Sequence, residues 1–406
     1  MTFWNDPINF ISEWLRGNFM GWGMAANLAI VITNVIGIFV IILFAMAIAI
    51  FLVWIERKVV ARFQDRLGPN RIGPFGLFQP FADIVKLIIK EDITPDGADK
   101  LIFNMAPVIS LASVILIWAV VPLASHIYGV DINVAVLYLV AAGAFGTIAV
   151  IMAGWSSNNK YALIGAFRMV ATMISYEIPM VVALLIPTII AGTMSLQGIS
   201  NAQNGIWFVF LSPLGLLLFI ISAIAELGRS PFDLNEAESE IVAGFHIEYT
   251  GMKFGLFYAG ELLHAFTFGG FMAVFFFGGY GGFFGLEKLA AFSWLSNSFI
   301  QMVVFLIKAL IGYWVIMWIK YSMPRIRIDH MLAFNWKFLT PLAFVLLMMT
   351  ALLDKLLAPT NFYVSGMFLS NLILGWIVIE IIRSRSKQER LKNVEPAAPV
   401  ELAAHH

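Results

Sequence analysis

The sequence predicts an all-α polytopic membrane protein with about nine transmembrane helices and one amphipathic surface helix. Of its 406 residues, 60% are apolar and 12% are charged, whereas a soluble domain carries about 25% charged residues. Uncharged runs such as 31–55 reach the ~20 residues that cross a bilayer core. Lys and Arg gather in alternate connections, which is typical of a chain that crosses a membrane repeatedly.

The first 30 residues are predicted to form an interfacial arm before the first span. They contain Asp6 and Glu13 and only one basic residue, Arg16. A cleaved signal peptide would begin with a positively charged region. We therefore expect this arm to lie at the membrane surface.

Apolar segments of sufficient length predict nine spans. The transmembrane domain is expected to cover 31–383, with long polar loops at 56–100, 227–253 and 320–337, and to be followed by a flexible cytoplasmic tail, 384–406. The nine spans are expected at 31–55, 102–123, 133–154, 162–192, 206–226, 253–282, 299–320, 339–358 and 364–383.

The distribution of positive charge predicts the orientation. On one side of the expected spans lie 21 of the 25 Lys and Arg residues; the other side holds only Arg16, Lys288 and Lys355, and Lys308 lies within a span. The positive-inside rule places the N-terminus outside and the C-terminus in the cytoplasm. In a bacterium this corresponds to a multi-pass protein of the cytoplasmic membrane.

The segment 75–91 is predicted to be the surface helix. Polar residues recur there at steps of four, three and four, at Gln79, Asp83, Lys86 and Lys90, opposite an apolar face. Such a helix lies along a membrane surface. Either it is a plain interfacial anchor, or it forms a rim where a lipid-borne substrate enters.

Acidic residues cluster between 226 and 248, and further ionisable residues fall within expected spans. The cluster contains Glu226, Asp233, Glu236, Glu238, Glu240 and Glu248. A solvated acidic loop is one interpretation. However, apolar residues alternate with the acids, so some carboxylates must approach apolar packing.

Glu177, Glu261, His264 and Lys308 fall within spans, where an ionisable group costs about 2.5–3.5 kcal/mol. One interpretation pairs them as fixed structural contacts, for example Glu261 with Lys308. In the other, the acids from Glu177 to Glu248 pass protons between loop and membrane as a coupled set.

Several site classes are excluded or disfavoured. The chain has no cysteine, which excludes disulfides and cysteine-held zinc or iron–sulfur clusters. Its six histidines are scattered and suggest no metal site, its Gly-rich patches are not nucleotide loops, and no basic domain points to nucleic acid. Any redox centre must therefore lie on a partner or be a diffusible substrate.

Six segments, in this order, resemble the H subunit of bacterial respiratory complex I. They are 54–74 (WIERKVVARFQDRLGPNRIGP), 79–87 (QPFADIVKL), 154–163 (GWSSNNKYAL), 174–179 (ISYEIP), 225–251 (AELGRSPFDLNEAESEIVAGFHIEYTG) and 324–329 (PRIRID). The resemblance implies a membrane subunit of a proton-pumping NADH:quinone oxidoreductase, with quinone as substrate, either ubiquinone or menaquinone, and no cofactor of its own.

The same resemblance implies the partners. Peripheral-arm subunits would carry the terminal iron–sulfur cluster and the rest of the quinone site, and would dock on the cytoplasmic loops. Small membrane subunits and antiporter-like subunits would adjoin the chain within the lipid bilayer. The electron donor itself is not specified by the sequence.

Site residues carry over by motif. The resemblance places the quinone tunnel and chamber at Glu56, Arg57, Gln64, Asp65, Arg66, Arg71, Asp83, Arg229, Phe232 and Asp233. It places the proton path at Glu177, Glu226, Asp233, Glu236, Glu238, Glu240, Glu248 and Glu261. The chain departs from commoner family residues at Thr172-Met173, Leu262, His264 and His330, which bears on hydrogen bonding inside the spans.

Three other functions compete with this one. A homologous membrane subunit of a hydrogenase or another complex that does not oxidise NADH is the nearest, although residues 232–240 favour the quinone-linked enzyme. An independent ion transporter would move ions without partners. A passive assembly anchor would tolerate neutral substitutions in the acidic loop.

Overall fold

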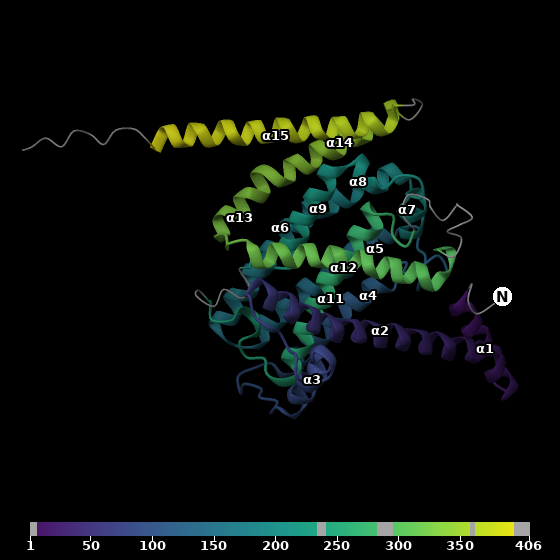
Figure 1. Ribbon diagram of the computed structural model, residues 1–406. Coiled ribbons are helices and arrows are strands. Elements are labelled where there is room, and N and C mark those ends of the chain that lie inside the picture. Colours follow the sequence, from purple (N-terminus) through teal and green to yellow (C-terminus); the bar gives the residue numbers. More distant parts are fainter. Residues whose placement is uncertain (1–5, 234–240, 282–294, 358–361, 394–406) are drawn as a thin grey trace, which may run out of the picture.

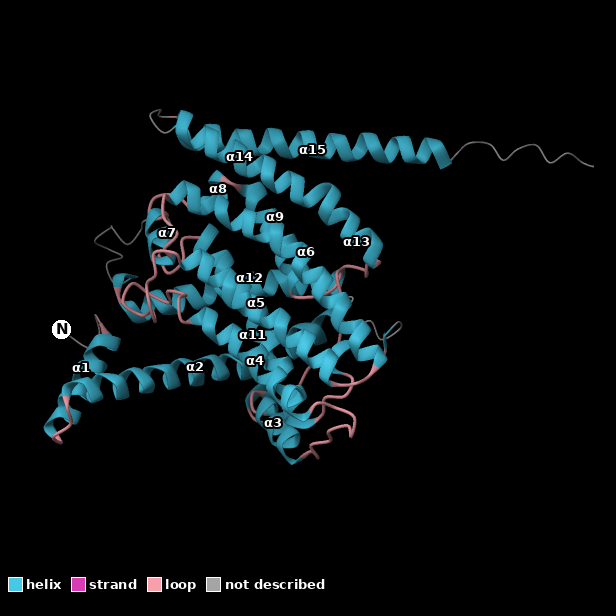
Figure 2. Ribbon diagram, turned by 180° about the vertical axis from the view of Figure 1, so that it is seen from behind, coloured by secondary structure: helices cyan, strands magenta, loops and turns pink. Residues whose placement is uncertain are grey.

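The computed structural model describes residues 6–233, 241–281, 295–357 and 362–393. Within these ranges the secondary structure consists of helices joined by loops (Figure 2). Eight of the described helices are long and apolar enough to cross a membrane. The predicted class, an all-α polytopic membrane protein, is confirmed.

The described helices follow the predicted spans in order, with one difference. The long helices are α2 (Ala26–Phe63), α4 (Lys100–Trp118), α5 (Ala135–Ser156), α6 (Lys160–Ala191), α11 (Gly251–Phe276), α12 (Ser298–Ser322), α14 (Thr340–Leu357) and α15 (Tyr363–Asn393). The predicted span 206–226 is instead two helices, α8 (Phe208–Leu211) and α9 (Pro213–Glu226), that meet at Ser212. Pro213 opens α9 at a position where its missing N–H breaks no helical hydrogen bond. The short helix α7 (Leu196–Ala202) lies just before α8.

The N-terminal arm is helical and shorter than predicted. Helix α1 (Pro7–Gly21) begins at an Asp6 cap, whose carboxylate accepts a hydrogen bond from the Asn9 backbone N–H at 3.2 Å. It packs against α2, which begins at Ala26 rather than at residue 31. Helix α2 also continues to Phe63, so Glu56 and Arg57 lie on a helix and not in a loop.

The predicted surface helix is α3 (Gln79–Ile89), preceded by a 3-10 turn, Pro74–Gly76. It packs against α2 and α11. An ion pair between Asp83 and Arg57 ties it to α2. Its apolar side chains Phe81, Val85 and Ile88 are more than half exposed, which fits a helix that lies in a membrane interface.

Helix α11 occupies the centre of the described bundle, between α4 and α12 (Figure 1). Of its most apolar 18-residue stretch, 83% is buried. It meets α12 where Gly269 faces Gly312: a Cβ on Gly269 would lie 2.3 Å from the Ala309 carbonyl oxygen. Small residues of this kind allow two membrane helices to approach closely.

Two long helices contain a proline whose freed carbonyl is satisfied from another element. Pro107 cannot bond the Phe103 carbonyl, which instead accepts from the Tyr249 hydroxyl at 3.2 Å. In α6, Pro179 frees the Ser175 carbonyl. This oxygen accepts from the side-chain amide of Asn335 at 2.5 Å.

Asn335 begins a π-helical turn, Asn335–Leu339, that joins α13 (Ile328–Phe334) to α14. Beyond α14, helix α15 lies at an outer edge and packs on α14, α8 and α9 (Figure 1). It extends through Asn393, so residues 384–393 are helical where a loose tail was predicted, while 394–406 lie outside the described residues. Helix α1 and the C-terminal end of α15 lie on opposite sides of the molecule in both views.

Candidate functional site

A cleft of about 880 Å³ lies where α2 ends, beside the following loop and the start of α3. Its size is within the range of pockets that hold a drug-sized ligand, about 300–1,000 Å³. Its lining is strongly basic, with one acid: Glu56 stands among Arg57, Arg66, Arg71 and Lys320. Such a lining favours electron-rich oxygen atoms.

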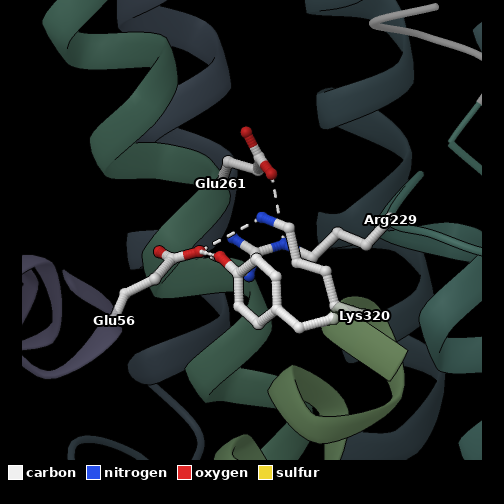
Figure 3. A network of polar contacts seen from close by, with 5 residues as sticks. Glu56, Arg229, Glu261 and Lys320 are labelled. Carbon is white, nitrogen blue, oxygen red and sulfur yellow. Dashed lines mark hydrogen bonds and ion pairs between the residues drawn. The ribbon is translucent and has the colours of Figure 1, made fainter. Parts of the chain in front are cut away.

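An ionic network begins at Glu56 and Lys320, which line this cleft, and extends behind it to Arg229 and Glu261 (Figure 3). One carboxylate oxygen of Glu56, Oε1, accepts from the Tyr321 hydroxyl at 2.7 Å and from Lys320 Nζ at 3.1 Å. The same oxygen lies 3.6 Å from an Arg229 guanidinium nitrogen. Arg229 Nε in turn donates to Glu261 at 3.1 Å. The Arg229 side chain therefore connects a carboxylate of the cleft to a carboxylate of α11.

The backbone at the end of α9 directs Arg229 to this position. Gly228 has φ +59°, a left-handed conformation that glycine adopts without strain. Its N–H bonds the Ala225 carbonyl, and the Arg229 N–H bonds the Ile224 carbonyl, which together form a Schellman motif. Burial opposes the charge of the guanidinium, but Glu261 and Glu56 outweigh it and raise the pKa of Arg229 above its ordinary value.

A second cavity, of about 80 Å³, lies behind the network and is called here the acid cavity. Glu226, Glu261, His246 and His264 line it, together with Tyr258. One water needs about 10–15 Å³, so several waters fit. Glu226 is 6% exposed and one of its carboxylate oxygens has no hydrogen-bond partner among the described residues. Burial lowers the pKa of His246, although Glu261 and Asp233 act in the opposite direction.

The acid cavity adjoins two other spaces through shared residues. Tyr258 lines both the acid cavity and the cleft. Glu226 and His264 line both the acid cavity and a third cavity of about 20 Å³, which Glu177 also lines. The third cavity has room for about one water. The polar residues thus follow one another from the cleft to Glu177.

The structure gathers many of the predicted quinone residues at the cleft, but not all of them. Glu56, Arg57, Arg66 and Arg71 line it, Asp83 pairs with Arg57, and Arg229 stands behind Glu56. Gln64 and Asp65 are exposed at the end of α2 and are not lining residues. Phe232 is buried against Tyr176, with ring centroids 5.4 Å apart.

The predicted proton-path residues divide into two groups. Glu177, Glu226 and Glu261 lie along the cavities. Asp233 pairs instead with Arg325 at 3.0 Å, and Glu248 accepts from the Asn159 amide at 2.7 Å. Glu236, Glu238 and Glu240 lie outside the described residues.

The alternative pairing of Glu261 with Lys308 is wrong. Glu261 contacts Arg229, whereas Lys308 donates to the backbone carbonyls of Phe277, Gly279 and Gly281 at 2.6–3.0 Å. These carbonyls follow the C-terminal end of α11, where a cation is favourable.

Sequence reasoning did not select Tyr258, Tyr321 and Lys320 as site residues. Tyr258 precedes Glu261 by three residues, which places the two side chains on one face of α11. That spacing was a usable signal. Lys320 and Tyr321 carried no signal in the sequence beyond their place at the end of a span. Their shared partner, Glu56, lies 264 positions away from Lys320 in the chain.

The comparisons with known proteins show the family of the chain. The sequence model of the family described as NADH dehydrogenase matches residues 36–351. The chain belongs to the NADH dehydrogenase family. The match includes every residue that lines the cleft and the two cavities.

Relatives of this NADH dehydrogenase family member are named as the H subunit of NADH-quinone oxidoreductase. The protein of Dehalococcoides mccartyi strain CBDB1 is 43% identical over 324 residues, 79% of this chain and 87% of the relative. That of Phocaeicola vulgatus is 39% identical over 357 residues, 86% of this chain and 98% of the relative. An H subunit of Geobacter metallireducens is 41% identical over 336 residues, 80% and 97% of the two chains.

Proposed function

We propose that this chain is the membrane subunit of a proton-translocating NADH:quinone oxidoreductase that forms the quinone access tunnel and part of the quinone chamber. It couples quinone reduction to proton pumping through a buried acidic path. One observation carries the proposal: the Glu56–Arg229–Glu261 network joins a ligand-sized cleft to two adjoining cavities, the acid cavity and the third cavity, which are lined by carboxylates.

The cleft suits a quinone that arrives from the bilayer. Gln79, the first residue of α3, lines the cleft, and the exposed apolar face of α3 borders lipid in the proposed orientation. A hydrophobic tail can slide along this face while the two-oxygen head meets the cations of the cleft. Reduction of the head takes up two electrons supplied by the complex and two protons, which gives a neutral quinol. The groups near Glu56 that supply those protons change their charge.

The ionic network can transmit that change inward. A change in the charge of Glu56 alters its electrostatic attraction to Arg229, which also forms an ion pair with Glu261 at 3.1 Å. Interactions between charges are strengthened in a low-dielectric interior. Moving one charge against 100 mV costs about 2.3 kcal/mol, so the pumping step draws on redox energy released elsewhere in the complex.

The proposed peripheral partners lie on the side of the cleft. Peripheral subunits with the terminal iron–sulfur cluster dock on the loops within 56–100, 227–253 and 320–337, and small membrane and antiporter-like subunits adjoin the span region. The N-terminus is outside and the C-terminus cytoplasmic. The positions of α1 and the end of α15 on opposite sides support this orientation.

A bulky substitution in the cleft tests quinone binding. Val60 lines the cleft, so Val60→Trp in the assembled complex is expected to raise the KM for quinone and lower quinone-linked NADH oxidation. NADH oxidation by a water-soluble acceptor upstream of quinone should be unchanged. The matched control is Val40→Trp, on the exposed part of the same helix. Unchanged quinone kinetics in Val60→Trp would contradict the proposed chamber.

A neutral substitution in the acid cavity tests coupling. Glu226→Gln is expected to lower proton translocation into vesicles at least about a hundredfold, the low end of what one proton-transferring group contributes to a rate. Glu380→Gln, at an exposed position of α15, serves as control. Equal rates of proton translocation in the two variants and in the unsubstituted complex would contradict the proposed acidic path.

A further inference from the structure

We infer that the hydroxyl of Tyr258 carries protons between the quinone-side cleft and the acid cavity. The inference rests on the proposed function and adds a residue to it. Among the described residues, Tyr258 is the one that lines both spaces. It lines the cleft together with Glu56, Arg57 and Lys320, and the acid cavity together with Glu261 and Glu226.

The hydroxyl is available for this task because no fixed partner holds it. Three other tyrosines near the site donate hydrogen bonds: Tyr176 to the Met331 carbonyl, Tyr249 to the Phe103 carbonyl and Tyr321 to Glu56. The Tyr313 hydroxyl also has no hydrogen-bond partner among the described residues, but Tyr313 lines neither the cleft nor the acid cavity. Among the described residues the Tyr258 hydroxyl makes no hydrogen bond; its ring stacks against Phe254 at 6.5 Å between centroids. The ring is thus oriented while the oxygen stays free to bond water in either space.

Position along the helix gives Tyr258 its neighbour in the acid cavity. Tyr258 and Glu261 are three residues apart on α11 and share a face. The second route between the two spaces, through Arg229, is made of a guanidinium that stays protonated in proteins. Arg229 can relay a change of charge, whereas a proton needs a group that both accepts and donates, as a phenol hydroxyl does.

The step balances at the Tyr258 oxygen. Quinone reduction, driven by electrons from the complex, draws a proton from the cleft water. The phenol O–H bond breaks toward the cleft as a new O–H bond forms with a proton from water in the acid cavity. The phenol is regenerated, and the acid cavity has supplied one proton that must be replaced from the direction of Glu226 and Glu177.

The test compares Tyr258→Phe with Tyr258→His in the assembled complex. Phenylalanine keeps the ring, so the KM for quinone is expected to stay unchanged while kcat of quinone-linked NADH oxidation falls about a hundredfold. Histidine again offers a donor and an acceptor and is expected to recover most of kcat. A purely packing role would leave the Phe variant at full rate.

Two controls separate this inference from the proposed function. Tyr138→Phe removes a hydroxyl that bonds the Leu116 carbonyl in another part of the bundle and should leave kcat unchanged. If Tyr258→Phe retains the full kcat while Glu226→Gln loses proton translocation, the role of Tyr258 is overturned and the acidic path stands. If both variants behave as the unsubstituted complex, the acidic path and the role of Tyr258 both fail.

Discussion

Asn335 donates a hydrogen bond to the Ser175 backbone oxygen at 2.5 Å, and this oxygen is free because Pro179 lies four residues later. The contact joins the π-helical turn before α14 to α6, two residues from Glu177. It therefore supports the part of α6 that carries Glu177, the carboxylate at the end of the proposed path away from the cleft.

Asn335→Leu is expected to lower the free energy of unfolding by about 1–3 kcal/mol, since it leaves a buried carbonyl unpaired. In a Pro179→Ala background the loss should be smaller, because the introduced alanine provides a helical N–H for that carbonyl. Denaturation of the four proteins of this cycle in detergent measures the difference. Equal losses in both backgrounds would show that Asn335 acts in some other way.

Arg229→Gln is expected to destabilise the chain by about 3–5 kcal/mol, because it leaves Glu56 and Glu261 without their shared buried cation. Arg325→Gln breaks a more exposed pair, with Asp233, and should cost at most about 1 kcal/mol. Thermal unfolding of the purified chain measures both. Similar losses from the two substitutions would contradict the importance of burial in the network.

Gly269→Ala is expected to destabilise the α11–α12 contact by about 1–3 kcal/mol, because the added Cβ would meet the Ala309 carbonyl at 2.3 Å. Gly37→Ala on α2 places a Cβ with nothing within 4 Å, and should be neutral or slightly stabilising. Denaturant midpoints compare the two. A Gly269→Ala protein as stable as Gly37→Ala would show that the two helices can separate freely.

Stability should fall as the pH drops below the ordinary pKa of histidine, about 6.5. Burial keeps the pKa of His246 below that value in the folded chain, against the opposing effect of Glu261 and Asp233. In the window between the two pKa values the unfolded state binds more protons, so stability decreases with decreasing pH. His246→Gln should flatten this part of the profile. An unchanged slope in the variant would assign it to other groups.

Much of the fold could be predicted because hydropathy directly reports which segments can lie in lipid. The eight long helices and the amphipathic α3 follow from it. Helix ends could not be predicted this way, since hydropathy marks where charge begins and α2 continues past Glu56 to Phe63. The break at Ser212 had a local signal in the following proline, which a count of apolar residues ignores.

The candidate site was predictable in part as a set of residues but not as a set of contacts. Motifs pointed to Glu56, Arg229 and Glu261, whereas the pairing of Glu261 with Arg229 instead of Lys308 depends on how α9, α11 and α12 meet. The same holds for Tyr258, whose importance comes from the two spaces that it separates. Partner choice is a tertiary property, and local spacing contains only part of it.

The network behind the cleft holds two formal cations, Arg229 and Lys320, and two formal anions, Glu56 and Glu261. It is electroneutral as it stands. Any single proton gained or lost there leaves an unbalanced charge beside Glu56 and Arg229, which are 4% and 2% exposed, and an unpaired buried charge costs up to several kcal/mol. Such a cluster favours strict exchange, in which the arrival of one proton is matched by the departure of another.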